Sequence, residues 1–198
     1  PGFDVFYMRI FLSVLILIFS LQSWTKADDI SDFQIEGMSI GDSLLDYFSE
    51  KEIKKNTVMY EDSSDDITYK TVEIGRYDTS LNFNLYDDLI FAYKNKDNKF
   101  IIVSLNGAKN FENREDCYKK MDSVIIDLNK FFANIEPTKI NIYESSLGIS
   151  RDVKFIFETG DYISVKCIDY HKEIYEDHLR ISMQRLDYMK WLNEKAYN

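Results

Sequence analysis

The sequence predicts a single α+β domain, in which antiparallel strands are covered by one long amphipathic helix and short helices lie near the N- and C-terminal ends. Three observations lead to this fold class. Apolar residues recur at helical spacing over residues 113–134, several β-rich segments are joined by short turns, and 45% of the residues are hydrophobic. With 29% charged residues and a length of 198, the chain is typical of one folded domain with a substantial core.

The first 27 residues are expected to lie outside that domain. Residues 1–7 precede Met8 and are interpreted as overrun or added sequence. Residues 8–27 have the pattern of a signal peptide, with an uncharged apolar run that is shorter than the roughly 20 residues needed to span a bilayer. We expect cleavage after Ala27, no stable membrane insertion afterwards, and a periplasmic or secreted domain over 28–198. The alternative is an uncleaved membrane anchor.

Short helical turns and four strands are expected in the first part of this domain. Ser49 with Glu52 and Ser39 with Asp42 have the spacing of capping boxes, which favours two helical turns over residues 41–55. Segments rich in β-branched and aromatic residues predict strands at 57–60, 67–74, 89–93 and 100–105, and the last two form a hairpin around residues 95–98.

The strongest predicted element is the helix over residues 113–134. Asn113 can cap its start, and Pro137 ends it. Its expected buried stripe consists of Cys117, Met121, Val124, Ile125, Leu128, Phe131 and Phe132. Further strands are expected at 139–143, 153–158, 162–168 and 179–185, with a tight turn at 159–161 and a helical tail over 187–196.

The two cysteines, Cys117 and Cys167, are expected to form a disulfide, because an even cysteine count in an exported chain is typical of an oxidising compartment. Two buried free thiols are the alternative.

Charge excludes one class of function. The chain carries 24 Lys+Arg and 34 Asp+Glu, a net charge of -10, whereas nucleic-acid binding needs a basic surface. We therefore expect no nucleic-acid partner.

No phosphate-binding glycine loop, nucleotide fingerprint or cysteine-pair metal motif occurs, so no cofactor is expected. The acidic stretch 61–66 lacks the glycine of a calcium loop and is interpreted as a charged turn.

One four-residue motif points to chemistry. Gly41-Asp42-Ser43-Leu44 is similar to the nucleophile block of the GDSL hydrolases, which are often exported esterases. That resemblance implies a small serine esterase using Ser43 with His171 or His178 as its base. The family's other blocks are absent, and its sheet is parallel rather than antiparallel, so no catalytic residue is assigned.

A second hypothesis is a divalent-metal site. His171, Glu173, Asp177 and His178 share one acidic stretch between two predicted strands. Imidazole and carboxylate groups ligate zinc, but the spacing matches no closed ligand motif, and a solvated polar loop is the default interpretation.

Residues 30–48, ISDFQIEGMSIGDSLLDYF, follow the signal pattern and resemble the mature N-terminus of an uncharacterised group of small exported proteins from AT-rich marine alphaproteobacteria. The resemblance implies a periplasmic setting and no known activity. From export, the α+β pattern and the incomplete motifs, the leading hypothesis is a non-catalytic binding protein. It would take a protein or a small ligand through a sheet face or a sheet edge.

Overall fold

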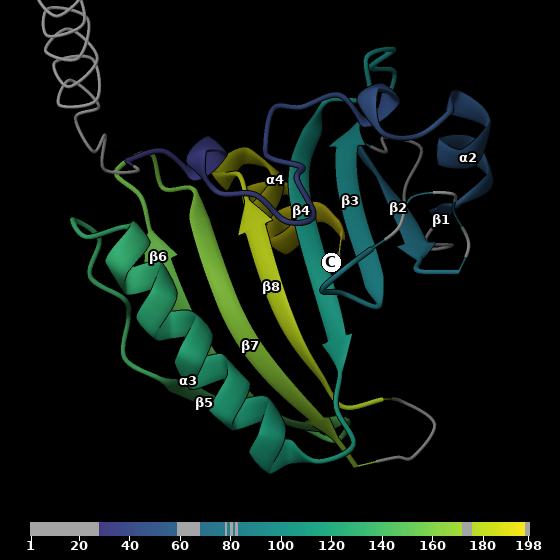
Figure 1. Cartoon of the computed structure of the whole chain (residues 1–198). Helices are drawn as coiled ribbons and strands as arrows, with labels where there is room; N and C mark the ends of the chain where they lie inside the picture. The colour runs from purple at the N-terminus through teal and green to yellow at the C-terminus, as the bar shows by residue number, and fades with distance from the viewer. Residues whose placement is uncertain are drawn as a thin grey trace, which may run out of the picture.

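The computed structural model describes residues 28–58, 68–77, 79, 81, 83–171 and 176–196 (Figure 1). The expected leader over 1–27, the acidic stretch 61–66 and Glu173 lie outside these residues. The described chain forms an antiparallel sheet of eight strands together with a few helices, which confirms the expected α+β class with an antiparallel sheet. The strands are β1 (Thr57–Val58), β2 (Tyr69–Gly75), β3 (Asp88–Lys94), β4 (Ile102–Asn110), β5 (Asn141–Glu144), β6 (Gly148–Ile156), β7 (Tyr162–Tyr170) and β8 (His178–Gln184).

The sheet joins two consecutive sets of strands through a pair that is distant in sequence. Its order is β1-β2-β3-β4-β8-β7-β6-β5, so β1 and β5 are the edges and β4 pairs with β8 in the middle. In that central pair Ser104 lies opposite Gln184, and Asn110 lies opposite His178. Short connections join β5 to β6 and β6 to β7. The turn between β6 and β7 contains Gly160, whose φ of +85° favours glycine.

Of the three N-terminal helices that the structure describes, two lie within the predicted range 41–55, and a third precedes it. They are η1 (Ile30–Asp32), η2 (Leu44–Asp46) and α2 (Glu50–Lys55). Ser49 and Glu52 form the expected capping box at the start of α2. Ser39 and Asp42 do not start a helix. The Ser39 N–H donates to the Asp42 carboxylate within a turn, and the Ser39 hydroxyl reaches the carbonyls of residues 31 and 33 instead.

The longest helix, α3 (Arg114–Phe131), begins where the sequence predicts and ends three residues early. The Asn113 side chain accepts the N–H of Asp116 and so caps the first turn. Most of the expected stripe packs into the core: Cys117, Met121, Leu128 and Phe132 are buried, Val124 and Ile125 are partly buried against them, and Phe131 is 45% exposed. Cys117 forms a disulfide with Cys167, which ties α3 to the centre of β7.

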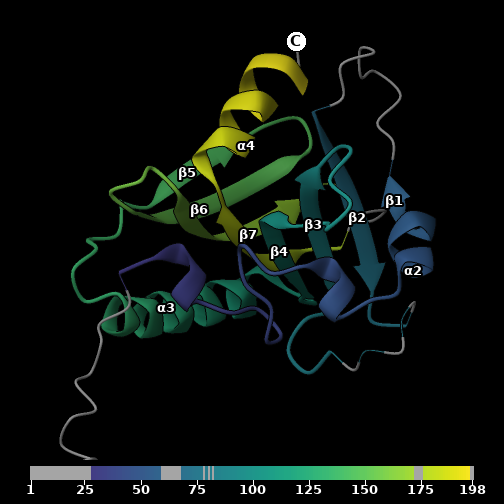
Figure 2. The same ribbon diagram turned by 90° about the horizontal axis from the view of Figure 1, so that it is seen from above.

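Different helices lie on the two faces of the sheet (Figure 2). The main core is shared by the sheet, α3 and the N-terminal segment. On the opposite side, α4 (Leu186–Trp191) continues into η3 (Leu192–Ala196). Tyr188 of α4 packs in a smaller apolar cluster with Tyr69, Ala92 and Val103. The α4 side of the sheet is therefore only partly covered.

Across the described ranges, no helix combines the length and the apolar character that a membrane crossing requires.

Candidate functional site

The two faces of the sheet differ in chemistry because side chains alternate along each strand. On β7, Ile163, Val165 and Cys167 are buried on the α3 side. The residues between them point to the other side, which we call the polar face. There, β7 and β8 bring together four cross-strand pairs: Tyr162–Gln184, Ser164–Ser182, Lys166–Arg180 and Ile168–His178.

The polar face contains a hollow of about 650 Å³. Ile90 of β3 and Ala108 of β4 lie along its floor, and residues 55–58 form one side. His178 and Arg180 of β8 form the other side. A volume of this size matches the pockets that take small molecules in proteins.

His178 is 7% exposed and lies at the start of β8. Its Nδ1 is 2.9 Å from the carbonyl oxygen of Glu176, and because a carbonyl only accepts, Nδ1 carries the proton. Burial lowers the pKa of His178, and the neighbouring charge of Arg180 lowers it further. The imidazole is therefore neutral at pH 7, and Nε2 is a hydrogen-bond acceptor that has no partner in the described part of the chain.

Two other residues that line the hollow also have a buried side-chain nitrogen atom without a partner in the described chain. Arg180 Nε and Asn56 Nδ2 are donors without a hydrogen-bond partner among the residues that the structure describes. Each buried polar group that stays unpaired costs about 1–3 kcal/mol. A molecule that reaches these atoms would regain part of that free energy, and it would need an acceptor for Arg180 and a donor for His178.

The charges around the hollow are mixed. Lys55 and Arg180 are cationic, and Glu73, Asp88 and Glu176 are anionic. Glu176 also accepts a hydrogen bond from the Asn110 side chain. The lining therefore offers cationic donors at Arg180 and carboxylate acceptors elsewhere, an arrangement that suits a small polar ligand better than an apolar one.

Ser43 lies far from both histidines. It caps η2, its hydroxyl donates to the Lys99 carbonyl at 2.6 Å, and it forms a β-bridge with Ile101 just before β4. His178 pairs with Asn110 at the other end of β4. An extended strand of that length separates them by roughly 30 Å.

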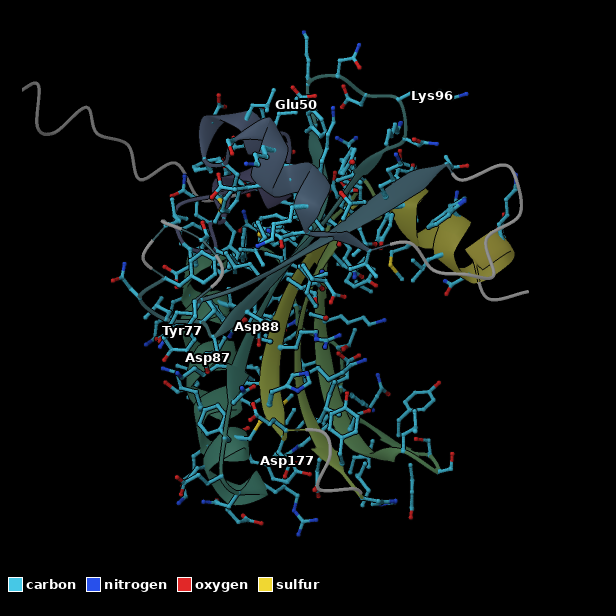
Figure 3. All side chains as sticks on the ribbon, turned by 90° about the vertical axis from the view of Figure 1, so that its right-hand side faces the viewer. Glu50, Tyr77, Asp87, Asp88, Lys96 and Asp177 are labelled. Carbon is cyan, nitrogen blue, oxygen red and sulfur yellow. A yellow bond between two sulfur atoms is a disulfide. The ribbon has the colours of Figure 1, made fainter. Side chains whose placement is uncertain are left out.

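The sticks in Figure 3 show the same separation, since Asp177 lies at the opposite end of the molecule from Glu50 and Lys96. His171 follows β7 at the Asp177 end, where its N–H donates to Leu147. The structure therefore does not bring a histidine within reach of Ser43, and the cap of η2 accounts for this serine without any chemistry.

The residues of the metal hypothesis are only partly assembled. His171 is exposed and His178 is buried, while an Asp177 oxygen accepts the Tyr170 N–H at 2.8 Å. Glu173 lies outside the described residues. Within 28–58, 68–77, 79, 81, 83–171 and 176–196, no three His, Cys, Asp or Glu side chains are placed to hold a metal ion.

The expected solvated loop around His178 is shorter than the sequence predicts. Strand β7 continues to Tyr170 and β8 starts at His178, so this histidine is buried in the sheet. The alternation of HLRISMQ could have extended the strand by one residue. Arg180 gave no signal in the sequence, because polar residues that alternate with apolar ones in a strand usually face solvent. Asn56 gave none because it ends α2, where asparagine is an ordinary capping residue.

The chain is therefore an α+β domain with a hollow on the polar face of an eight-stranded antiparallel sheet. Comparison of its sequence and structure with family models, curated proteins and solved structures gave no match.

Proposed function

We propose that this chain is an exported, non-catalytic binding protein that holds a small polar ligand in the hollow of the polar face. One observation carries the proposal: the hollow has the size of a ligand pocket, and three of the residues that line it, Asn56, His178 and Arg180, each have a buried side-chain nitrogen atom that lacks a partner within the described chain. Structural polar groups are usually paired, so unpaired ones around a hollow favour a binding role.

Export to the periplasm or the medium is supported by two features. The signal-peptide pattern over residues 8–27 directs a chain out of the cytoplasm. The Cys117–Cys167 disulfide is typical of proteins that mature in an oxidising compartment. The resemblance of residues 30–48 to small exported proteins agrees with the same setting.

Native mass spectrometry of the exported protein, purified without competing ligands, tests the binding role. We expect a bound small molecule in the wild type, lost in His178→Ala and in Arg180→Gln. Arg151→Gln is the matched control, because Arg151 is also half-buried with an unpartnered Nε in the described chain, but lies on the α3 side above the Tyr118 ring.

If His178→Ala and Arg180→Gln both retain the molecule, or if only Arg151→Gln loses it, the molecule binds outside the hollow. A wild-type protein that carries no molecule, and that binds no small polar compound by calorimetry, would refute the proposal. Thermal unfolding of every variant verifies that each one folds.

A further inference from the structure

Two cations lie directly opposite each other beside the hollow. Lys166 of β7 and Arg180 of β8 are register partners on the polar face, and both are half-buried. Like charges in this position destabilise a sheet. None of the ion pairs among the described residues involves either side chain. Structural stability therefore does not explain why these two cations lie opposite each other.

The nearest acid in the register is a poor counter-charge. Asp152 of β6 lies opposite Lys166, but it is 7% exposed and its Oδ1 has no partner within the described chain. Burial raises the pKa of Asp152, although Lys166 and Lys154 act in the opposite direction. Among the described residues, Asp152 forms no ion pair with either cation.

Hydrogen-bond donors and a third cation surround the pair. Ser164 and Ser182 face each other one step along β7 and β8, and both are buried on the polar face. Lys154 of β6 lies opposite Ser164, and its Nζ is 4.7 Å from the centre of the Tyr162 ring. Hydroxyl, ammonium and guanidinium groups are the donors that proteins use for carboxylate, sulfate and phosphate groups.

Arg180 also lines the hollow, so this group of residues borders the hollow at Arg180. We propose that Lys166 and Arg180, with Ser164 and Ser182, bind the oxyanion head group of the ligand, whose body lies in the hollow over Ala108. The ligand is then a small polar acid. The Glu73, Asp88 and Glu176 carboxylates of the hollow disfavour a second anionic group and favour hydroxyl or ammonium donors on the ligand's body.

This inference rests on the proposed binding function and narrows its ligand to one class. Isothermal titration at constant ionic strength tests it with inorganic phosphate, sulfate and acetate as separate probes. We expect saturable binding of at least one of them, weakened at least about tenfold in Lys166→Gln and in Arg180→Gln. Arg151→Gln should bind like the wild type. The probe that binds most tightly distinguishes a carboxylate head group from a phosphate or a sulfate.

A second measurement separates binding from a structural role. In the absence of anions, Lys166→Gln should raise the midpoint of thermal unfolding, because the substitution removes the repulsion with Arg180. A lower midpoint would show that Lys166 stabilises the fold, and it would overturn the inference.

The inference also fails if none of the three anions binds, or if Lys166→Gln binds them as the wild type does. In that case a neutral molecule that is held by the wild type and lost in His178→Ala would leave the proposed function standing. Absence of any bound molecule would refute both.

Discussion

The disulfide between Cys117 and Cys167 should supply a large share of the protein's stability. The bridge closes a loop with a sequence separation of 50 residues. In the loop-entropy model, a loop of that length stabilises the native state by about 4 kcal/mol. Small domains are stable by only about 5–15 kcal/mol, so a double Cys117→Ala, Cys167→Ala variant should be close to its limit of stability.

Chemical denaturation of the wild type and the double variant measures this difference. We expect a loss of about 4 kcal/mol in the free energy of unfolding, together with a similar loss when the wild type is reduced. The double variant is the control, since a reducing agent should leave its stability unchanged. A loss below about 1 kcal/mol would refute the reasoning, because it would show that α3 and β7 stay together without the constraint.

Three further predictions concern single residues. The Glu36 carboxylate accepts the N–H groups of residues 84–86 at 3.0, 2.6 and 3.1 Å, so Glu36→Ala should cost about 2 kcal/mol in chemical denaturation, and a change near zero would contradict that role. Burial alone would raise the pKa of Asp87, but a backbone N–H and two cations lower it below its ordinary 3.8. Ionised Asp87 therefore stabilises the fold above that value, and this contribution to the free energy of unfolding is lost as the pH falls through the lowered pKa. An Asp87→Asn variant whose free energy of unfolding depends on acid pH as the wild type's does would contradict this. Ile53 is fully buried and Ile142 is 71% exposed. Ile53→Ala should therefore lower the free energy of unfolding by about 2–5 kcal/mol, and Ile142→Ala by less than about 0.5 kcal/mol. Equal losses would contradict the burial of α2.

Local patterns predicted the local elements well. The Asn113 cap, the capping box at Ser49 and the hairpin of β3 and β4 each follow from a few neighbouring residues, and all three are present. The end of α3 was wrong because the apolar pattern continues past the last helical residue. Phe132 follows α3 and is fully buried although it is no longer helical, so its burial does not show where the helix ends.

The candidate site could not be predicted in the same way. The pairing of β4 with β8 brings residues 104–110 beside residues 178–184, and nothing in either segment specifies the other. Unless the pairing of β4 with β8 is known, Ala108 and Arg180 cannot be placed in the same hollow. The histidine-rich stretch did point to the correct end of the sheet, but the sequence indicated a solvated loop where the structure has a buried His178.

The Cys117–Cys167 bridge was predictable for a different reason. It depends on the cysteine count and the expected compartment rather than on any contact between the elements. Its position then explains why α3 lies against β7 at Cys167. The bridge thus adds a covalent contact to a helix that also packs into the core through Met121 and Leu128.

A crystal structure of the exported protein, isolated without competing ligands, tests the central claim most directly. The account predicts electron density for a small molecule in the hollow, with an acidic group at Arg180 and a donor at His178 Nε2. Density at Ser43 or at the β5 edge together with an empty hollow would contradict it.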